Sequence, residues 1–389
     1  MTRQLVLIGA SLAHLHLLAH LAHQPVVGVQ VTLVSPQTRL IHPPMVPDFI
    51  AGQYTLDDCT VPLEPWLQRS GARWLQHAVQ ALNPLARTLL LTNGSELAYD
   101  TLSLSPSLSD NGLAASRQAL ELTLPGARHN ALFTHPMEAF CALWPRVPEL
   151  AATQSLRVAV ICRSTLQRHT PTPRNTPAPA EFNPHAIELA LSIRQRLPGS
   201  AVTLITGGSP PTQHATASLQ THVTQALRDR NITVLMDNAS AISPSEVALE
   251  SGARLACDVP VMVNGDTVPH WVAESGLALD ARGWIDVDVR QHCTNYPGVF
   301  ASRHDGQGTW ADPWAAERAA QGLSRNLVAA LTGHPLTTLT PGWNKLKLLS
   351  CGNGQGIAQW GEHSAQGRWA GWLKRRIDHW LVARYRRNL

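Results

Sequence analysis

The N-terminal segment contains the pattern that most limits how this chain can fold. A short apolar run over residues 5–8 ends at Gly9, an apolar pattern with helical spacing follows as far as Ala22, and a second strand-like run covers residues 29–36. Short apolar runs predict buried strands, and the spacing between them predicts a helix. The chain therefore begins with a β-α-β unit, which is typical of α/β folds with a parallel sheet.

The turn after the first strand of such a unit is where a dinucleotide pyrophosphate rests. Glycines in the pattern G-x-G-x-x-G let bare backbone approach the phosphates, and N–H groups at the helix start bind them. Here the six positions, residues 9–14, read GASLAH, so only the first glycine is present. Ser11 either crowds the ligand or hydrogen-bonds to it, and we expect His14 to push helix and strand apart. On this motif alone, a β-α-β unit without a nucleotide is an equally good interpretation.

Composition limits the class of protein. With 389 residues, of which 44% are hydrophobic, the chain can bury a large core in two or three domains. A formal net charge of +4 gives no long-range field that would indicate nucleic acid as a partner. The six cysteines form no C-x-x-C pair, which favours a reduced, cytoplasmic setting over a zinc site. Histidines interrupt the apolar start that an export signal needs, and no apolar run is long enough to predict a membrane span.

Three segments follow the first unit in a characteristic order: MVPDFIAGQYTLDD at residues 45–58, SGARW at 70–74 and LAYDTLSLSPS at 97–107. This order resembles the pyridine nucleotide-disulfide oxidoreductase superfamily, in particular NADH dehydrogenase-like flavoproteins whose first loop reads G-G-G-H-A-H. His14 and His16 fit that loop, whereas Ser11 departs from it, as does Leu12, where the loop has histidine. The resemblance extends over nearly the whole chain.

A second β-α-β pattern, with strands at residues 156–161 and 201–205 and a helix at 186–197, is similar to the NADH-binding unit of that superfamily. The resemblance implies that Glu188 on this helix faces a nicotinamide, and a surface carboxylate is the alternative. The glycine loop of this unit is absent. Instead, a proline-rich insertion over residues 164–185 follows the first strand, which predicts an exposed loop rather than a phosphate cradle.

The segment that returns the chain to the flavin domain carries the most specific match. Val263-Asn264-Gly265 stands where the family has an A-T-G turn, and residues 295–305, NYPGVFASRHD, are similar to the family motif P-x-V-F-A-x-G-D. The aspartate of that motif binds the flavin. In this chain Arg303 and His304 occupy the glycine and aspartate positions, and Asp305 follows one residue late.

The resemblance implies an α/β fold with two Rossmann-like dinucleotide-binding domains and a C-terminal helical extension. The FAD-type domain is expected over residues 1–120 and 266–335, the inserted NAD(P)H-type domain over 121–265, and the C-terminal region over 336–389. FAD and NAD(P)H are the implied cofactors. The residues expected at the cofactor are Gly9, Ala10, Ser11, His14, Ser35, Gly265, Arg303, His304, Asp305 and Trp314.

Three nucleotide-contacting turns have lost glycine while the scaffold has kept its pattern, so two functions remain open. The first is an FAD-dependent, NADH dehydrogenase-like oxidoreductase that passes electrons from a reduced donor to a quinone or small acceptor, with impaired NADH binding. The second is a cofactor-free scaffold that acts in binding or assembly. Sulfide:quinone oxidoreductase-like chemistry at Cys162 and Cys351 is a further alternative; Arg163 would lower the thiol pKa, and buried inert thiols are the simpler interpretation.

Two helices complete the sequence-based prediction. Residues 312–333 predict an amphipathic helix on which Trp314 either stacks on a flavin or fills a cavity. Residues 369–387 combine tryptophans and arginines at helical spacing, which suits the surface of an anionic membrane and a peripheral location on its inner face. Packing on the chain's own domain or on a partner, including a homodimer, is the alternative. The spacing of His16, His20 and His23 would allow metal binding, but no carboxylate or cysteine accompanies them, so an exposed histidine face is expected and no metal site.

Overall fold

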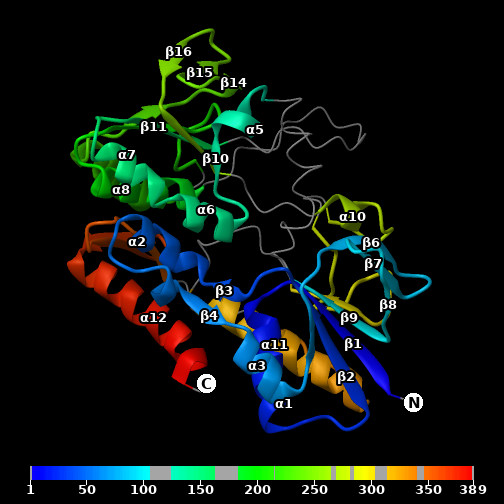
Figure 1. The fold of residues 1–389 in the computed structure, drawn as a ribbon. Helices are drawn as coiled ribbons and strands as arrows, with labels where there is room; N and C mark the ends of the chain where they lie inside the picture. Colours follow the sequence, from blue (N-terminus) through cyan, green and yellow to red (C-terminus); the bar gives the residue numbers. More distant parts are fainter. Residues whose placement is uncertain are drawn as a thin grey trace.

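The computed structural model describes residues 2–105, 124–162, 183–213, 215–263, 269–280, 284–302, 313–339 and 346–387. Within these residues the chain forms two five-stranded sheets in which all neighbouring strands are parallel, and a smaller C-terminal unit lies against both (Figure 1). The expected α/β fold with two Rossmann-like sheets and a C-terminal helix is confirmed.

The first sheet is built mainly from the N-terminal part of the chain. Its strands, in spatial order, are β18 (Val299–Ala301), β9 (Thr101–Leu104), β1 (Arg3–Ile8), β2 (Val29–Val34) and β5 (Arg73–Leu75). Helices α1 (Leu12–His23), α3 (Glu64–Ser70) and α11 (Pro313–Thr332) pack together on one side, sharing an apolar core with β1 and β2. An antiparallel sheet of β6 (Val79–Asn83), β7 (Thr88–Leu91) and β8 (Glu96–Ala98), with α10 (His270–Ala273), covers the other side.

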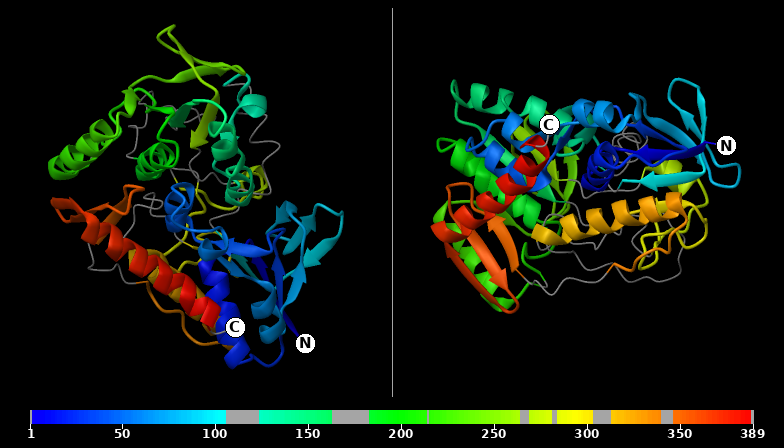
Figure 2. Two further views of the ribbon diagram at one scale, coloured as in Figure 1. Left: turned by 60° about the vertical axis from the view of Figure 1, so that its left-hand side comes forward. Right: turned by 90° about the horizontal axis from the view of Figure 1, so that it is seen from below.

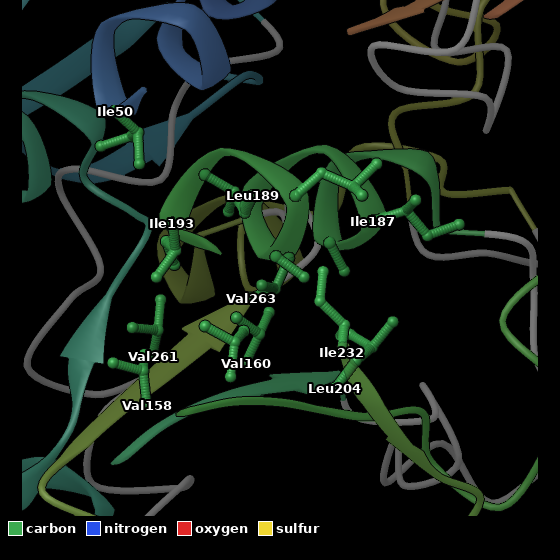
Figure 3. Close-up of a cluster of buried hydrophobic side chains, with 14 of the residues drawn as sticks. Ile50, Val158, Val160, Ile187, Leu189, Ile193, Leu204, Ile232, Val261 and Val263 are labelled. Carbon is green, nitrogen blue, oxygen red and sulfur yellow. The ribbon is translucent and has the colours of Figure 1, made fainter. Parts of the chain in front are cut away.

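The second sheet is built from the middle part of the chain. Its strands are β10 (Leu132–Phe133), β17 (Val259–Val263), β11 (Arg157–Cys162), β12 (Ala201–Ile205) and β13 (Thr233–Leu235). The helices around it are α5 (Ala127–Asn130), α6 (Met137–Leu143), α7 (Arg146–Ala151), α8 (Pro184–Arg196) and α9 (Ala217–Asp229), and a small sheet is formed by β14 (Ala239–Ile242), β15 (Glu246–Leu249) and β16 (Arg254–Ala256). Valine and isoleucine are dense in β11 and β17 because both faces of a parallel sheet are buried. Figure 3 shows Leu189 and Ile193 of α8 packed over these strands.

The C-terminal unit, residues 346–387, consists of a small antiparallel sheet and one long helix. Its elements are β19 (Leu346–Ser350), β20 (Gly356–Trp360), β21 (His363–Gly367) and α12 (Arg368–Arg387). The views of Figure 2 show α12 (red) running from this sheet toward α1. The helix approaches the sheet closely at Gly371, because this residue has no side chain. A Cβ at this position would overlap the Gly354 carbonyl.

A segment of the N-terminal half lies between the three parts. It contains β3 (Arg39–Ile41), η1 (Pro43–Met45), α2 (Val46–Ile50), η2 (Asp57–Cys59) and β4 (Thr60–Pro62). Helix α2 packs on α8, while α12 packs on η1, η2 and β4. The C-terminal unit is therefore attached to the first part of the fold through this segment, and its strands also pack directly on α8 and α9. No helix in the described residues is long and apolar enough to cross a membrane.

Candidate functional site

The turn between β1 and α1 has the geometry of a nucleotide-binding loop. Gly9 has a φ of +83°, a conformation that glycine adopts without strain, and its N–H bonds Val34 O at 2.9 Å. Ser11 is the N-cap of α1: its Oγ accepts a hydrogen bond from His14 N at 3.2 Å. The hydroxyl at the second glycine position is thus used by the helix itself.

His14 is buried and paired in this turn, and the expectation that it separates helix and strand stays a prediction. Its Nδ1 lies 2.7 Å from Gly9 O and its Nε2 lies 2.9 Å from Ser103 Oγ. Because a carbonyl only accepts, Nδ1 carries the hydrogen and Nε2 accepts from the Ser103 hydroxyl. Burial lowers the pKa of His14 to about 4 against the Gly9 hydrogen bond, so the ring is neutral. The imidazole therefore joins the turn to β9.

Donors for an anion remain at the start of α1. None of the described residues accepts a hydrogen bond from the backbone N–H groups of Leu12 or Ala13, and Ala13 is buried. First-turn N–H groups of a helix have no intrahelical partner and are suited to binding phosphate. The left-handed glycine and these donors fit the diphosphate of FAD, even though two glycines of the loop are replaced.

The end of β2 is less suited to the ribose. Dinucleotide-binding folds place an acidic side chain near this point to accept hydrogen bonds from ribose hydroxyls. Here Ser35 is fully buried, its hydroxyl donates to Gln37 Oε1 at 2.7 Å, and its carbonyl accepts from Trp74 Nε1 at 3.0 Å. Any sugar held here would meet neutral groups rather than a carboxylate.

Four of the expected cofactor residues cannot be placed. Gly265, Arg303, His304 and Asp305 lie outside the described residues, as does most of the proline-rich insertion. Trp314, at the second residue of α11, is partly buried and packs against the apolar core beneath α12.

Glu188 is not on the surface, so that alternative is wrong. It lies on α8 and is 3% exposed, and its Oε1 accepts a hydrogen bond from Ser350 N in β19 at 2.6 Å. Burial raises the pKa of Glu188 to about 8, opposed by Lys374 and the Ser350 N–H. The carboxyl thus faces the C-terminal unit.

The cysteines do not form a reactive site. Burial raises the pKa of the Cys162 thiol to about 12 and that of Cys351 to about 11. All six cysteines are free and buried. Sulfur chemistry that requires a depressed thiol pKa has no support at either position.

Sequence reasoning missed a polar cluster where α1, α11 and α12 meet. His16 Nε2 lies 3.0 Å from Glu317 Oε1 and 2.5 Å from the Tyr385 hydroxyl, and Arg384 donates to the same carboxylate oxygen at 2.7 Å. Hence the histidine face of α1 is not uniformly exposed: His16 is paired inside the fold. The helical spacing placed His16 on a face of α1 but could not identify partners as distant in the sequence as Glu317 and Tyr385.

The comparisons with known proteins agree with this geometry. Residues 184–302 match the family described as "Pyridine nucleotide-disulphide oxidoreductase". A sulfide:quinone oxidoreductase from the hyperthermophilic bacterium Aquifex aeolicus superposes with a TM-score of 0.76 at 16% identity, covering 100% of this chain and 92% of that one. NDH2 from Plasmodium falciparum, solved in complex with NADH, gives 0.71 at 12% identity, covering 99% and 98%.

An NAD-dependent persulfide reductase from A. fulgidus is also similar, with a TM-score of 0.64 at 13% identity, covering 92% of this chain and 64% of that one. No curated protein matches the sequence. At such identities the solved structures establish the fold. Together with the family match, they confirm the resemblance inferred from the sequence.

Proposed function

We propose that this chain, which has the fold and the family signature of the pyridine nucleotide-disulfide oxidoreductases, is an FAD-dependent oxidoreductase that passes electrons from a reduced donor to a quinone or another small acceptor. The observation that carries the proposal is the β1–α1 turn, where Gly9 is left-handed and the N–H groups of Leu12 and Ala13 have no acceptor among the described residues. Such a turn is built to receive a diphosphate.

Each part of this loop has a defined role toward the cofactor. Leu12 and Ala13 would donate backbone hydrogen bonds to the diphosphate, and Ser35 with Gln37 would lie near the ribose. FAD, once bound, would supply two-electron redox chemistry. His14 positions the loop by joining Gly9 to Ser103 and, being neutral, adds no charge next to the phosphates.

NADH is a poor electron donor in this proposal. The second unit has no glycine loop after Cys162, so no backbone cradle for a second diphosphate is encoded there. Glu188, the residue that the resemblance assigns to the nicotinamide, is bonded to Ser350 N instead. We therefore expect a different donor, or NADH binding that is much weaker than a complete loop would give.

A quinone acceptor fits a peripheral position on an anionic membrane. Three tryptophans of α12, Trp369, Trp372 and Trp380, are 53%, 58% and 53% exposed. The Arg376 guanidinium lies 5.9 Å from the Trp372 ring centre, and that of Arg384 lies 5.8 Å from Trp380. Exposed indoles interleaved with arginines suit the headgroup region of a bilayer, where indoles lie at the interface and cations meet lipid phosphates.

A cofactor-free scaffold is the second candidate. It is favoured by the end of β2, where Ser35 and Gln37 are hydrogen-bonded to each other and the expected carboxylate for a ribose is replaced by these neutral side chains. In that case the fold would serve only to present surfaces such as the exposed face of α12.

Anaerobic stopped-flow spectroscopy tests the proposed activity. In protein reconstituted with FAD, a stoichiometric chemical reductant should bleach the flavin absorbance. Mixing this reduced protein once with a short-chain quinone should restore the absorbance. NADH should bleach the flavin slowly or not at all. Reduced flavin that the quinone cannot reoxidise would contradict the proposed acceptor, and rapid bleaching by micromolar NADH would contradict the impaired NADH site.

A further inference from the structure

A buried cluster of charged side chains joins the C-terminal unit to the rest of the fold. Asp48 belongs to α2, Glu188 to α8, and Lys374 and Asp378 to α12. Each of the four residues is no more than 5% exposed. Charged side chains are seldom buried to this degree unless they are paired, so the balance of charge in the cluster decides how stable it is.

Ser350 of β19 connects the two carboxyl groups that come from the body of the protein. Its backbone N–H donates to Glu188 Oε1 at 2.6 Å, and its hydroxyl donates to Asp48 Oδ1. One residue of the C-terminal unit therefore bonds a carboxyl group on α8 and another on α2. These two contacts join β19 to both helices.

Lys374 and Asp378 balance each other. Lys374 Nζ donates to Asp378 Oδ2 at 2.8 Å and also to Pro44 O. Burial opposes both charges, yet the pairing raises the pKa of Lys374 above its usual value and lowers that of Asp378, so both groups are ionised at neutral pH. The positive charge of Lys374 is thus already balanced by Asp378. His42 Nε2 lies 3.4 Å from Oδ1 of the same aspartate.

Glu188 and Asp48 both accept hydrogen bonds from Ser350. The Glu188 carboxyl, whose pKa burial raises to about 8, holds a proton at pH 7. Because Oε1 accepts from Ser350 N, the proton is on Oε2. Ionising Glu188 in the closed state would add a second buried negative charge beside Asp48 without a second cation, which is unfavourable. The other titratable or charged groups around the cluster are His42, Tyr54, Arg230, Cys351, Arg375 and His379.

We propose that closure of the C-terminal unit on α2 and α8 takes up one proton, held on Glu188, so that the unit is fastened more firmly as the pH falls and is loosened as the pH rises through neutrality. The open state exposes Glu188 to water, where the carboxyl releases its proton to solvent. Since α12 carries the exposed tryptophan face, loosening would also change how firmly that face is held against the body of the protein.

The direction of the effect follows from linkage. The closed state binds a proton that the open state releases at any pH between the ordinary glutamate value of 4.5 and about 8. Between these two pH values the equilibrium constant for opening of the C-terminal unit should increase about tenfold per pH unit. Above about pH 8 it should stay constant.

Hydrogen exchange of the full-length protein, measured by mass spectrometry between pH 5.5 and 9 and corrected for intrinsic rates, tests the proposal. Peptides covering residues 346–367 should lose protection steeply up to about pH 8 and then level off. In Glu188→Gln, which mimics the protonated side chain, the protection should be flat over the same range. The matched control is Glu246→Gln, which makes the same change at an exposed ion pair with Arg254 and should keep the wild-type profile.

Asp48→Asn provides an independent variant if Glu188→Gln fails to fold. Removing the neighbouring negative charge favours ionisation of Glu188 in the closed state, so protection should level off at a lower pH than in the wild type. Wild-type protection that does not change between pH 5.5 and 8 would overturn the proposal. So would a Glu188→Gln protein with the wild-type slope, or an Asp48→Asn protein whose levelling point is unmoved.

Discussion

At the scale of single residues, the replacement of a glycine by His14 is the most informative departure from the nucleotide-binding pattern. The third glycine of such a loop normally allows tight packing between helix and strand. Here the imidazole replaces that packing with two hydrogen bonds, to Gly9 O and Ser103 Oγ, inside the fold. Losing glycine at this position therefore does not mean losing the turn.

The buried His14 predicts acid sensitivity of the fold. The pKa of His14 is lowered from 6.5 to about 4 by burial, so the unfolded chain binds a proton that the folded chain rejects. Stability is fully present above pH 6.5 and is lost as the pH falls toward 4, by about 3 kcal/mol at most. The difference in unfolding free energy between the wild type and His14→Gln, measured by urea denaturation at pH 7.5 and at pH 4.5, isolates this loss from the opposite pH dependence of Glu188.

His14→Gln removes this titration, so the variant should be less stable than the wild type at pH 7.5 and should lose less stability than the wild type on acidification. His363→Gln, on the exposed strand β21, serves as the control and should behave like the wild type. Equal pH dependence in the wild type and in His14→Gln would show that the imidazole is not buried as described.

The buried thiols predict a chemically inert native protein. Burial raises the pKa of Cys162 and Cys351, so neither forms the thiolate that reacts with disulfide reagents. At pH 7.5 the native protein should react with such a reagent at least about a hundred times more slowly than the urea-unfolded chain. Rapid labelling of the Cys162 peptide in native protein would restore it as a candidate nucleophile.

At the scale of elements, much of the fold could be predicted because the signals are local. The Asn93-Gly94 dipeptide, a hairpin-turn signal, lies between β7 and β8, and Gly71 ends α3 in the left-handed conformation that glycine favours. The strand bounds of β12 were predicted to the residue. Such features depend on sequence neighbours alone.

The small sheet of the C-terminal unit and the charged cluster beneath it were not predicted. The three strands are as long as β12 but less apolar, and β21 reads HSAQG, so their pattern does not identify a sheet without its partners. Ser350 meets Asp48 across 302 residues and Glu188 across 162. No periodicity links positions that far apart.

Helix α12 packs on the chain itself, which was one of the two alternatives, and the membrane alternative stays a prediction that rests on its exposed face. One face packs in the fold through Ile377, Leu381 and Tyr385, while the opposite face exposes three tryptophans. We predict binding to vesicles that contain anionic lipid, weakened by salt. Replacing Arg368 and Arg376 by Gln should weaken it by about 2 kcal/mol, roughly thirtyfold.

The matched control for that experiment is Arg146→Gln, which removes an exposed arginine from α7, away from the tryptophan face. Vesicle flotation of the wild type and both variants, at low and high salt, makes the measurement. Equal binding to neutral and anionic vesicles, or a control that binds as poorly as the double variant, would contradict the proposed surface.

At the scale of the whole molecule, the two parallel sheets are present and the β1–α1 turn has a left-handed glycine, whereas the sequence after Cys162 contains no glycine loop. The fold could be predicted because the hydrophobic pattern of the strands and helices repeats that of a known superfamily. Whether the cofactor site is intact could not be predicted from the sequence. It depends on whether the Ser11 and His14 side chains leave the N–H groups at the start of α1 free to bind a phosphate. In the structure both side chains bond to the protein itself and leave donors at the start of α1.

The most direct test of this claim is a titration of the purified, cofactor-free protein with FAD, followed by flavin absorbance after gel filtration. The wild type should retain one FAD per chain. Leu12→Glu places a negative charge at the first residue of α1, where it favours the helix but repels a diphosphate, so it should weaken binding by more than about tenfold relative to Leu12→Gln. A wild-type protein that retains no FAD, or a glutamate variant that binds as well as the glutamine variant, would contradict the proposed cradle.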